Sequence, residues 1–357
     1  MCTSLPLWLP NSCFAYRQLA PLLLYCIRYE YYRMGVDVMN RTLVSVFGTI
    51  FVDCKGFAFQ NYKADTRNLG SIEFVHGGVG RNVAENLSQL DIPTALVSTT
   101  DESAIGKEVV DRLQRLGIST TNVKYGQKGM GMWLAILTEA GELAGSISQM
   151  PDLSVMSGIV AEHGRSIVEC SEHIVLELDL NEAIVKQVLQ ISKDLDKPVY
   201  GIPGNLDVVL HYPEILKGLA CFICNNYEMD LLAKAEFSAA SAEEKKSLLT
   251  HFVHAAGLQS MIVTLGAEGS LYYDARSKEI GFQQVFPVDV VDTSGAGDAF
   301  FSGAVAALVR GASLAEAAVC GTKVAGWTIS SKESICSNLR EKMKEDQTFK
   351  DMLAEKV

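Results

Sequence analysis

The chain has 357 residues, 48% of them hydrophobic, which is enough for a sizeable core in one large domain or two ordinary ones. Its formal net charge of -11 argues against a protein built to bind nucleic acid or an anionic membrane surface. No apolar run is long enough to cross a bilayer, and nine cysteines without framework spacing favour a reducing, cytoplasmic location.

Residues 1–40 differ from the rest of the chain. They contain three prolines and many aromatic residues but show no clear period. The apolar stretch LAPLLLYCI is short and contains Pro21, and no basic segment precedes it within the first sixteen residues, so we do not expect a secretory signal. We expect a loosely attached extension outside the fold, or a mis-assigned start.

From Arg41 onward, short apolar runs alternate with segments of helical period. Buried strands are predicted at 43–48, 94–99, 173–178, 198–202, 221–225 and 261–266, and helices at 81–90, 105–117 and 181–196. This alternation predicts an α/β fold of three α/β/α layers with a mostly parallel central sheet. We expect residues 41–340 to form one domain, with a C-terminal helix or tail at 341–357.

Two regions break this alternation, at 51–76 and about 123–148. Both contain extended segments without a strong helix between them, and MWLAILTEAGELAGSIS has a hairpin pattern around Ala140 and Gly141. We expect these segments to form a small β lid beside the main sheet. An exposed strand edge invites pairing with a second copy, so a homodimer through the lid is possible.

The one CxxC pattern joins Cys221 and Cys224 within a predicted strand. Positions i and i+3 of a strand face opposite sides, which suits shared metal ligation poorly. We therefore interpret both cysteines as buried thiols rather than as a redox or metal pair.

The stretch VDTSGAGDAFFSG follows a strand-like FPVDVV at 286–291. A helix is expected to begin at Asp298, which leaves the amides of Gly295, Ala296 and Gly297 unpaired at its N-terminus, where they can bind an anion. If a phosphoryl group sits on those amides, Asp298 can accept the proton of an attacking hydroxyl. The alternative is a plain helix cap, which would not require Gly-Ala-Gly before it.

A second motif, EFVHGGVGRNVAENL, places Gly77 and Gly78 in a tight turn and Asn82 in the first turn of a helix. The Asn82 amide suits a polyol, as does the carboxylate of Asp53, which can accept from two neighbouring hydroxyls. By itself the motif is equally well explained as a strand-to-helix turn.

Two weaker motifs follow later strands. Asn225 and Glu228 lie one helical turn apart and could orient hydrated Mg²⁺, although a capping role is equally good. Thr264, Gly266 and Gly269 stand at a strand end where a nucleotide could bind, or in a simple hairpin turn. The chain contains neither a Walker-type phosphate loop nor GxGxxG.

Together and in this order, these motifs resemble the ribokinase-like (PfkB) family of sugar and nucleoside kinases over about residues 41–340. GGVGRNVAENL is similar to the first family signature and DTSGAGDAF to the second, which is highly specific. The resemblance implies a β lid, ATP as donor, Mg²⁺ as cofactor, and in many relatives a monovalent cation (K⁺) near the loop of Asp292. It also implies a role for each matching residue: Asp298 as catalytic base, Gly295, Ala296 and Gly297 as anion hole, Asn225 and Glu228 organising the metal through water, Asp53, Gly77, Gly78 and Asn82 contacting the sugar, and Thr264 with Gly266 at the nucleotide edge.

Within the family, residues 52–87 are most similar to pseudouridine kinases. Two segments depart from that pattern: GMGMWLAIL replaces a small hydroxyl residue at a lid strand, and ISQM places Gln149 where those enzymes have an aspartate. Met130, Met132 and Trp133 could alter which sugar or base fits, although we favour the methionines as lid core.

The resulting expectation is an ATP-dependent kinase of a sugar or nucleoside hydroxyl, similar to pseudouridine kinases. Two alternatives remain open: a simple pentose or hexose kinase, and a non-catalytic sugar or nucleotide sensor that keeps the fold.

Overall fold

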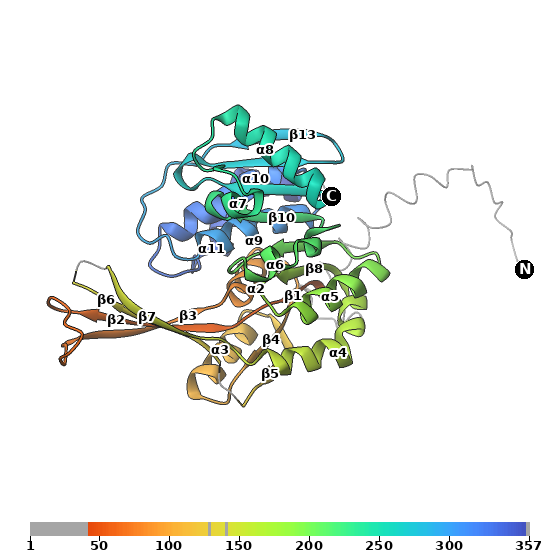
Figure 1. Cartoon of the computed structure of the whole chain (residues 1–357). Helices are drawn as coiled ribbons and strands as arrows, with labels where there is room; N and C mark the ends of the chain where they lie inside the picture. The colour runs from red at the N-terminus through yellow and green to blue at the C-terminus, as the bar shows by residue number, and fades with distance from the viewer. Residues whose placement is uncertain (1–41, 128–129, 140–141, 355–357) are drawn as a thin grey trace, which may run out of the picture.

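The computed structural model describes residues 42–127, 130–139 and 142–354, and Figure 1 shows their arrangement. The strands are β1 (Thr42–Phe47), β2 (Phe51–Ala58), β3 (Gly70–Gly77), β4 (Thr94–Thr100), β5 (Ser119–Tyr125), β6 (Gly131–Leu137), β7 (Leu143–Gln149), β8 (Ser171–Glu177), β9 (Val199–Ile202), β10 (Cys221–Asn225), β11 (Ser260–Thr264), β12 (Ser270–Asp274) and β13 (Glu279–Gln283). The α-helices are α2 (Val79–Gln89), α3 (Ala104–Arg115), α4 (Leu153–Glu169), α5 (Glu182–Asp194), α6 (Asp207–His211), α7 (Asn226–Ala233), α8 (Ala242–Ala256), α9 (Ala296–Leu308), α10 (Leu314–Ile329), α11 (Leu339–Glu345) and α12 (Gln347–Ala354), and two 3₁₀ turns, η1 (Pro213–Leu216) and η2 (Gly266–Glu268), complete the set.

The central sheet runs in the order β13-β12-β11-β10-β9-β8-β1-β4-β5. All neighbours from β11 to β5 pair in parallel, while β12 and β13 add an antiparallel edge. Each of the six predicted strands is present, because buried apolar runs flanked by helices can satisfy their backbone only in such a sheet. The expected α/β fold is confirmed.

Separate apolar cores cover the two faces of this sheet. One core contains residues of α2, α3, α9 and α10, and the other contains residues of α4, α5 and α8. Cys221 belongs to the first core and Cys224 to the second, and both are buried. The two thiols therefore lie on opposite faces, as the strand period predicted, and burial raises the pKa of Cys221 to about 12.

The lid is a second sheet in the order β3-β2-β6-β7, and it projects from the body as a twisted arm in Figure 1. β2 pairs antiparallel with β3 and parallel with β6, and β6 pairs antiparallel with β7. The expected lid segment from about 123 begins too early, because residues 123–125 belong to β5 of the central sheet. The hairpin expected around 140–141 has its two strands, although the turn itself lies outside the described residues.

The stretch FPVDVV at 286–291 is not a strand, contrary to the prediction. Its backbone leaves the sheet after β13, and the amides of Val291 and Asp292 donate to the carbonyl of Ile329 at the end of α10. Val290 is 62% exposed, so an apolar run that meets no neighbouring strand stays extended without forming one.

The ends of the chain complete the fold. The C-terminal segment, expected as a helix or tail, contains α11 and α12, which pack Leu339, Met343 and Phe349 into the first core. The expectation for residues 1–40 falls outside the described residues. No helix in the described part of the chain is both long and apolar enough to span a membrane.

Candidate active site

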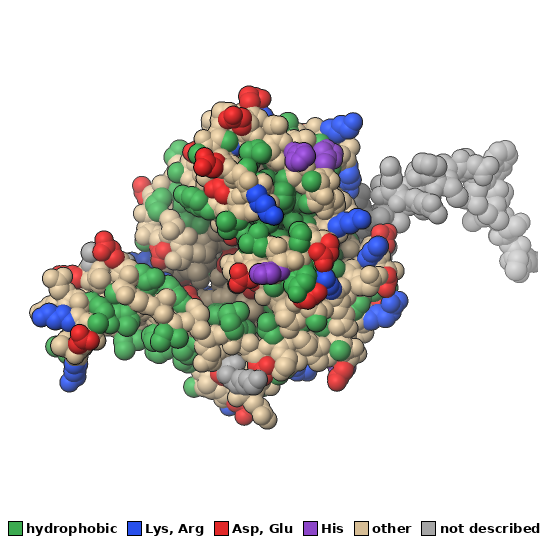
Figure 2. Space-filling model, viewed as in Figure 1, with side chains coloured by type: hydrophobic (Ala, Val, Ile, Leu, Met, Phe, Trp, Pro, Cys, Tyr) green, Lys and Arg blue, Asp and Glu red, His purple; other side chains and the backbone are tan. Residues whose placement is uncertain are grey.

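The polar residues singled out in the sequence gather at the carboxyl edge of the central sheet. β1 lies between β4 and β8, so the strand order reverses there, and ligands of open α/β sheets bind in the crevice at such a point. Figure 2 shows a hollow between the lid and the larger body. The candidate site is built around this hollow.

The N-terminus of α9 contains the Gly-Ala-Gly stretch. Gly295 has a φ of 76° and is the N-cap, so the helix begins at Ala296, two residues earlier than predicted, and Asp298 lies in its first turn. The Ala296 amide donates to the carbonyl of Thr293 and is therefore not free, contrary to the expectation for all three amides. Among the described residues the amides of Gly295 and Gly297 have no acceptor, and a Cβ on Gly297 would meet only open space. An anion can therefore approach the helix here.

Asp298 on α9 contacts Asn82 on α2. Nδ2 of Asn82 donates to Oδ2 of Asp298 over 2.7 Å, and α2 packs against α9. Burial raises the pKa of Asp298 to about 6, against the opposing effects of this hydrogen bond and the positive charge of Arg81. The Oδ1 atom of Asn82 is buried without a hydrogen-bond partner among the described residues. Such an atom is costly unless a ligand donates to it.

The glycine pair joins lid strand β3 to α2. Gly78 has a φ of 95° and a Cβ there would lie 2.6 Å from the amide nitrogen of Phe51, so this position requires glycine. A Cβ on Gly77 would lie 2.9 Å from Oδ1 of Asp53, so a larger residue there would displace that carboxylate. Asp53 is half-buried on β2, and burial raises the pKa of its carboxyl. The structure therefore brings Asp53, Gly77, Gly78, Asn82 and Asp298 to the same corner of the hollow.

Glu177, at the end of β8, was missed by the sequence analysis. It is buried and accepts hydrogen bonds from the amide of Thr49 (2.7 Å), the hydroxyl of Thr49 (2.9 Å) and the amide of Gly80 (3.2 Å). The carboxylate thereby fixes the turn after β1 and the start of α2. Burial raises the pKa of Glu177 to about 7. The signal in the sequence was an acid within the apolar run HIVLEL.

Asp179, two residues further on, was also missed. Its Oδ2 atom accepts from the amides of Gly204 and Asn205, while its buried Oδ1 atom has no partner in the described part of the chain. Burial raises the pKa of Asp179 to about 7, and the negative charge of Glu228 raises it further. The unpartnered oxygen lies in an acidic environment that a cation would stabilise.

Asn225 and Glu228 form a complete capping box at the start of α7. Oδ1 of Asn225 accepts from the amide of Glu228 (2.8 Å), and Oε2 of Glu228 accepts from the amide of Asn225 (2.7 Å). The capping role of these two residues is therefore confirmed. The capping box uses only Oε2 of Glu228, so Oε1 takes no part in it. Over the described ranges, no group of three or more His, Cys, Asp or Glu side chains is arranged to ligate a metal directly.

The weakest motif lies next to this box. Thr264 pairs with Asn225 across β10 and β11, and its hydroxyl donates to the carbonyl of Cys224 (3.4 Å). Gly266 and Gly269 form the turn of a β11–β12 hairpin, and a Cβ on Gly269 would clash with the carbonyl of Gln283. Gly269 is thus required by packing, whereas Gly266 faces open space and leaves room for a ligand.

The unusual lid segment divides between core and site. Met130 is buried, but in the first core against the central sheet rather than in a core of the lid, and its carbonyl accepts from Nε2 of Gln149 (3.1 Å). Trp133 pairs directly with Asp53 across β6 and β2, so the half-buried indole and the carboxylate share one face of the lid.

Comparisons with known proteins identify the family by sequence and the fold by structure. The model described as "pfkB family carbohydrate kinase" matches residues 41–341. Guanosine-inosine kinase of Exiguobacterium acetylicum is 32% identical over 83% of this chain and 96% of its own length. Pseudouridine kinase of Escherichia coli is 24% identical over 78% and 87%, so the expected greater similarity to pseudouridine kinases is wrong. Among solved structures, ribokinase of Arabidopsis thaliana complexed with ribose and ATP covers 88% of this chain and 99% of its own at 21% identity and a TM-score of 0.73.

Proposed function

This chain belongs to the pfkB family of carbohydrate kinases, and we propose that it transfers the γ-phosphoryl group of ATP to a primary hydroxyl of a nucleoside. The family makes the chain a phosphotransferase with an alcohol acceptor. The observation that carries the site assignment is the Asn82–Asp298 hydrogen bond beside the free amides of α9.

In the proposed reaction the chain positions an alcohol and a phosphoryl group side by side. Asp298 accepts the hydroxyl proton late in the transfer, because the transition state is loose. The amides of Gly295 and Gly297 stabilise the charge on the phosphoryl oxygens. The free Oδ1 atom of Asn82 and the carboxylate of Asp53 accept from other hydroxyls of the acceptor.

Magnesium fits the residues at the other end of the hollow. Oδ1 of Asp179 has no partner among the described residues, and the carboxylate of Glu228 lies close enough for its charge to raise the pKa of Asp179. Mg²⁺ keeps most of its waters, so two acids that contact it through water suffice. When bound, the ion would neutralise charge on the phosphate oxygens. Thr264 and Gly266 would border the nucleotide.

A nucleoside is favoured over a free sugar by two observations. The match to guanosine-inosine kinase covers 83% of this chain and 96% of that enzyme. In addition, Trp133 stands directly opposite Asp53, so a ring held by the indole would lie next to a ribose held by the carboxylate. Base stacking on an aromatic side chain is worth about 1–3 kcal/mol. We therefore place purine nucleosides before pseudouridine as acceptors.

The lid supplies the remaining function, since it covers the hollow and limits water attack on ATP. We also propose a homodimer through this lid, because the face opposite Asp53 is apolar and exposed: Phe74, Leu134 and Ile147 are aligned across its strands.

The test is ADP release with ATP and Mg²⁺ against guanosine, inosine, pseudouridine, adenosine, ribose and fructose, with product masses confirmed. Phosphorylation of a purine nucleoside at higher kcat/KM than of ribose supports the proposal. Preference for pseudouridine would restore the assignment suggested by residues 52–87. Turnover of ribose or fructose alone would overturn the nucleoside assignment. Silence across the panel with ATP bound would favour a sensor.

A further inference from the structure

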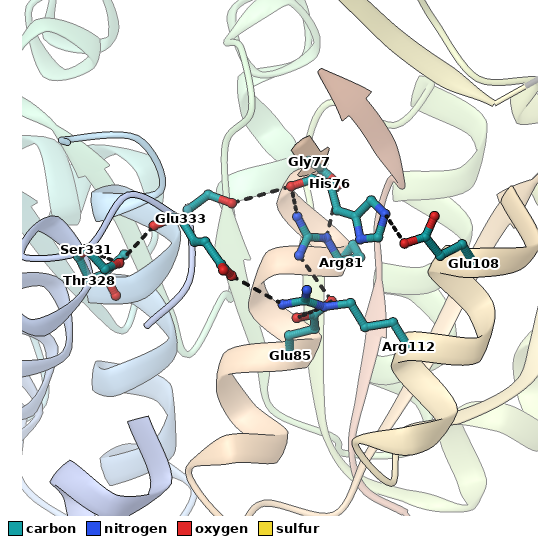
Figure 3. Close-up of polar contacts among 10 residues, drawn as sticks. His76, Gly77, Arg81, Glu85, Glu108, Arg112, Thr328, Ser331 and Glu333 are labelled. Atoms are coloured by element: carbon teal, nitrogen blue, oxygen red, sulfur yellow. Dashed lines mark hydrogen bonds and ion pairs between the residues drawn. The ribbon is translucent and has the colours of Figure 1, made fainter. Parts of the chain in front are cut away.

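Lid strand β3 joins α2 at His76–Gly78, which we call the lid hinge, and a buried cation lies beneath it. The proposed reaction gives this cation no contact with a substrate. Arg81 is 1% exposed, on the first turn of α2 between Gly80 and Asn82. Its Nε donates to the carbonyl of Gly77 over 3.2 Å, and a terminal nitrogen donates to the carbonyl of His76. Figure 3 shows the guanidinium pointing at these two carbonyls, which belong to the last residues of lid strand β3.

The charge of Arg81 is balanced within the same helix. Nη1 of Arg81 lies 3.1 Å from Oε1 of Glu85, a side chain that is 0% exposed. The opposite oxygen of Glu85 pairs with Nε of Arg112 on α3 over 3.0 Å. Burying a charged trio is costly and gains little stability over apolar residues of similar volume. A planar fork that can donate to two carbonyls at once is what arginine adds here.

The network of polar contacts continues to the segment that packs against Gly295, the N-cap of α9. The carbonyl of His76 also accepts from Oγ of Ser334 over 3.4 Å, and Arg112 lies 3.8 Å from the carboxylate of Glu333. The carbonyl of Ser334 packs so tightly against Gly295 that a Cβ there would lie 2.1 Å away. Segment 331–336 therefore lies between the lid hinge and the N-terminus of α9.

The position of the lid hinge fixes the positions of Asp53 and Asn82, the two residues proposed to contact the acceptor. Gly77 is packed against the carboxylate of Asp53, and Asn82 follows Arg81 directly in the chain. A shift of the His76–Gly77 carbonyls would move Asp53 relative to Asn82, and both relative to Asp298. Misplacement of about 1 Å can cost about 100-fold in rate.

We propose that Arg81 is a positioning residue: its buried guanidinium fixes the end of β3 so that the lid and α2 present the acceptor to Asp298. The proposal rests on the proposed function for the role of Asp53, Asn82 and Asp298. At 1% exposure, Arg81 would act through the backbone carbonyls that it holds rather than by contact with a substrate.

Arg310 provides a matched control. It is also buried and donates to two backbone carbonyls, those of Ala306 (2.9 Å) and Leu90 (2.6 Å), the latter just after α2. Arg81→Met and Arg310→Met each remove a buried arginine that bridges two carbonyls, but only Arg81 is at the hinge. We expect both to lower the unfolding temperature, so stability alone does not distinguish them.

The kinetic constants do distinguish them. Arg81→Met should lower kcat/KM for the acceptor about 100-fold, with a raised acceptor KM and an unchanged KM for ATP. Arg310→Met should keep the wild-type constants. Arg81→Lys retains the charge without the planar fork and should stay impaired. Full recovery in Arg81→Lys, or equal kinetic losses in Arg81→Met and Arg310→Met, would overturn the proposal.

Failure of the proposed function is separable from failure of this inference. The assay uses whichever acceptor the wild-type chain phosphorylates, so a sugar in place of a nucleoside leaves the test intact. Amide hydrogen exchange supplies a readout without turnover: Arg81→Met should speed exchange in peptides covering 70–82 and 331–336, and Arg310→Met should not. Equal exchange of these peptides in both variants contradicts the inference even if no acceptor is found.

Discussion

At the scale of single residues, the carboxylate of Asp298 is buried and accepts a hydrogen bond from the side-chain amide of Asn82. Asp298→Asn keeps the shape and a hydrogen bond to Asn82 but cannot take a proton. We expect turnover to fall at least about 100-fold without a lower unfolding temperature. Asp274→Asn, at the amino edge of the sheet, is the control and should keep full turnover. An active Asp298→Asn enzyme would remove this residue from the role of base.

Trp133 is the residue through which a base would be distinguished from a plain sugar. Removing the indole should raise the nucleoside KM about 5- to 150-fold, since base stacking contributes about 1–3 kcal/mol, and should leave any turnover of ribose unchanged. The measurement is steady-state kinetics of Trp133→Ala with both acceptors. Leu134→Ala changes the next residue, which points to the opposite face of the lid, and serves as control. Equal effects on nucleoside and ribose would rule out a base platform.

The residues that could be predicted are those whose chemistry is local. Gly-Ala-Gly-Asp and Gly-Gly carry their own turn geometry, so the turns at Gly78 and Gly295 and the position of Asp298 near a helix start could be predicted from spacing. Glu177 and Asp179 could not be, because a single acid at a strand end is ordinary until the sheet order is known. That order places β8 two strands from β10, which brings Asp179 within electrostatic reach of Glu228.

At the scale of elements, period and burial predicted the six inner strands of the nine-stranded central sheet, because each needed its apolar faces covered, but not β5, β12 and β13 at its edges. The same pattern failed at 286–291, where apolar residues lie along α10 and have no strand to pair with. The boundary of the lid was also misplaced, since β5 and β6 are both extended and only their pairing partners separate them. Pairing partners are long-range information that a local pattern does not contain.

The exposed apolar face of the lid predicts a homodimer. Phe74, Leu134 and Ile147 lie in one row across the sheet and are 56%, 36% and 69% exposed, and Figure 2 shows apolar side chains gathered along this arm. Such a patch marks an interface. We expect a dimer in sedimentation velocity, which Phe74→Glu with Ile147→Glu converts to a monomer. Leu210→Glu, an exposed leucine on α6, should leave the dimer intact. A monomeric wild-type chain would contradict this prediction.

At the scale of the whole molecule, the acids of the site act on one another across three elements. Asp298 on α9 raises the pKa of Glu177 on β8, and Glu228 on α7 raises that of both Asp298 and Asp179. The positive charge of Arg81 opposes this repulsion at Asp298, where burial still raises the pKa. The repulsion that remains among these acids weakens the fold at the site where we propose that magnesium nucleotide binds.

This conflict predicts opposite pH dependences for stability and activity. The folded pKa values of Asp298 (about 6) and of Glu177 (about 7) lie above those of the unfolded chain, so the folded state binds more protons between about pH 4 and 7. Stability from these groups is therefore lost as pH rises through that window. Activity should do the reverse, because kcat/KM needs ionised Asp298 and should fall tenfold per pH unit below about 6.

Buried His173 has an opposing effect on stability: its pKa is lowered to about 4, so it adds stability as pH rises through part of the same range. The contribution of Asp298 is therefore measured by comparing wild type with a variant. Asp298→Asn leaves the histidine in place, so the difference in unfolding temperature between variant and wild type cancels its contribution. That difference should grow in favour of Asp298→Asn by about 3 °C from pH 5 to pH 8, because about one pH unit of the shift titrates in this window and is worth about 1.4 kcal/mol. Magnesium with ATP should reduce it by neutralising the cluster. A difference that stays constant with pH would mean that Asp298 titrates alike in the folded and unfolded chain, and the fall in kcat/KM would then have to come from another group.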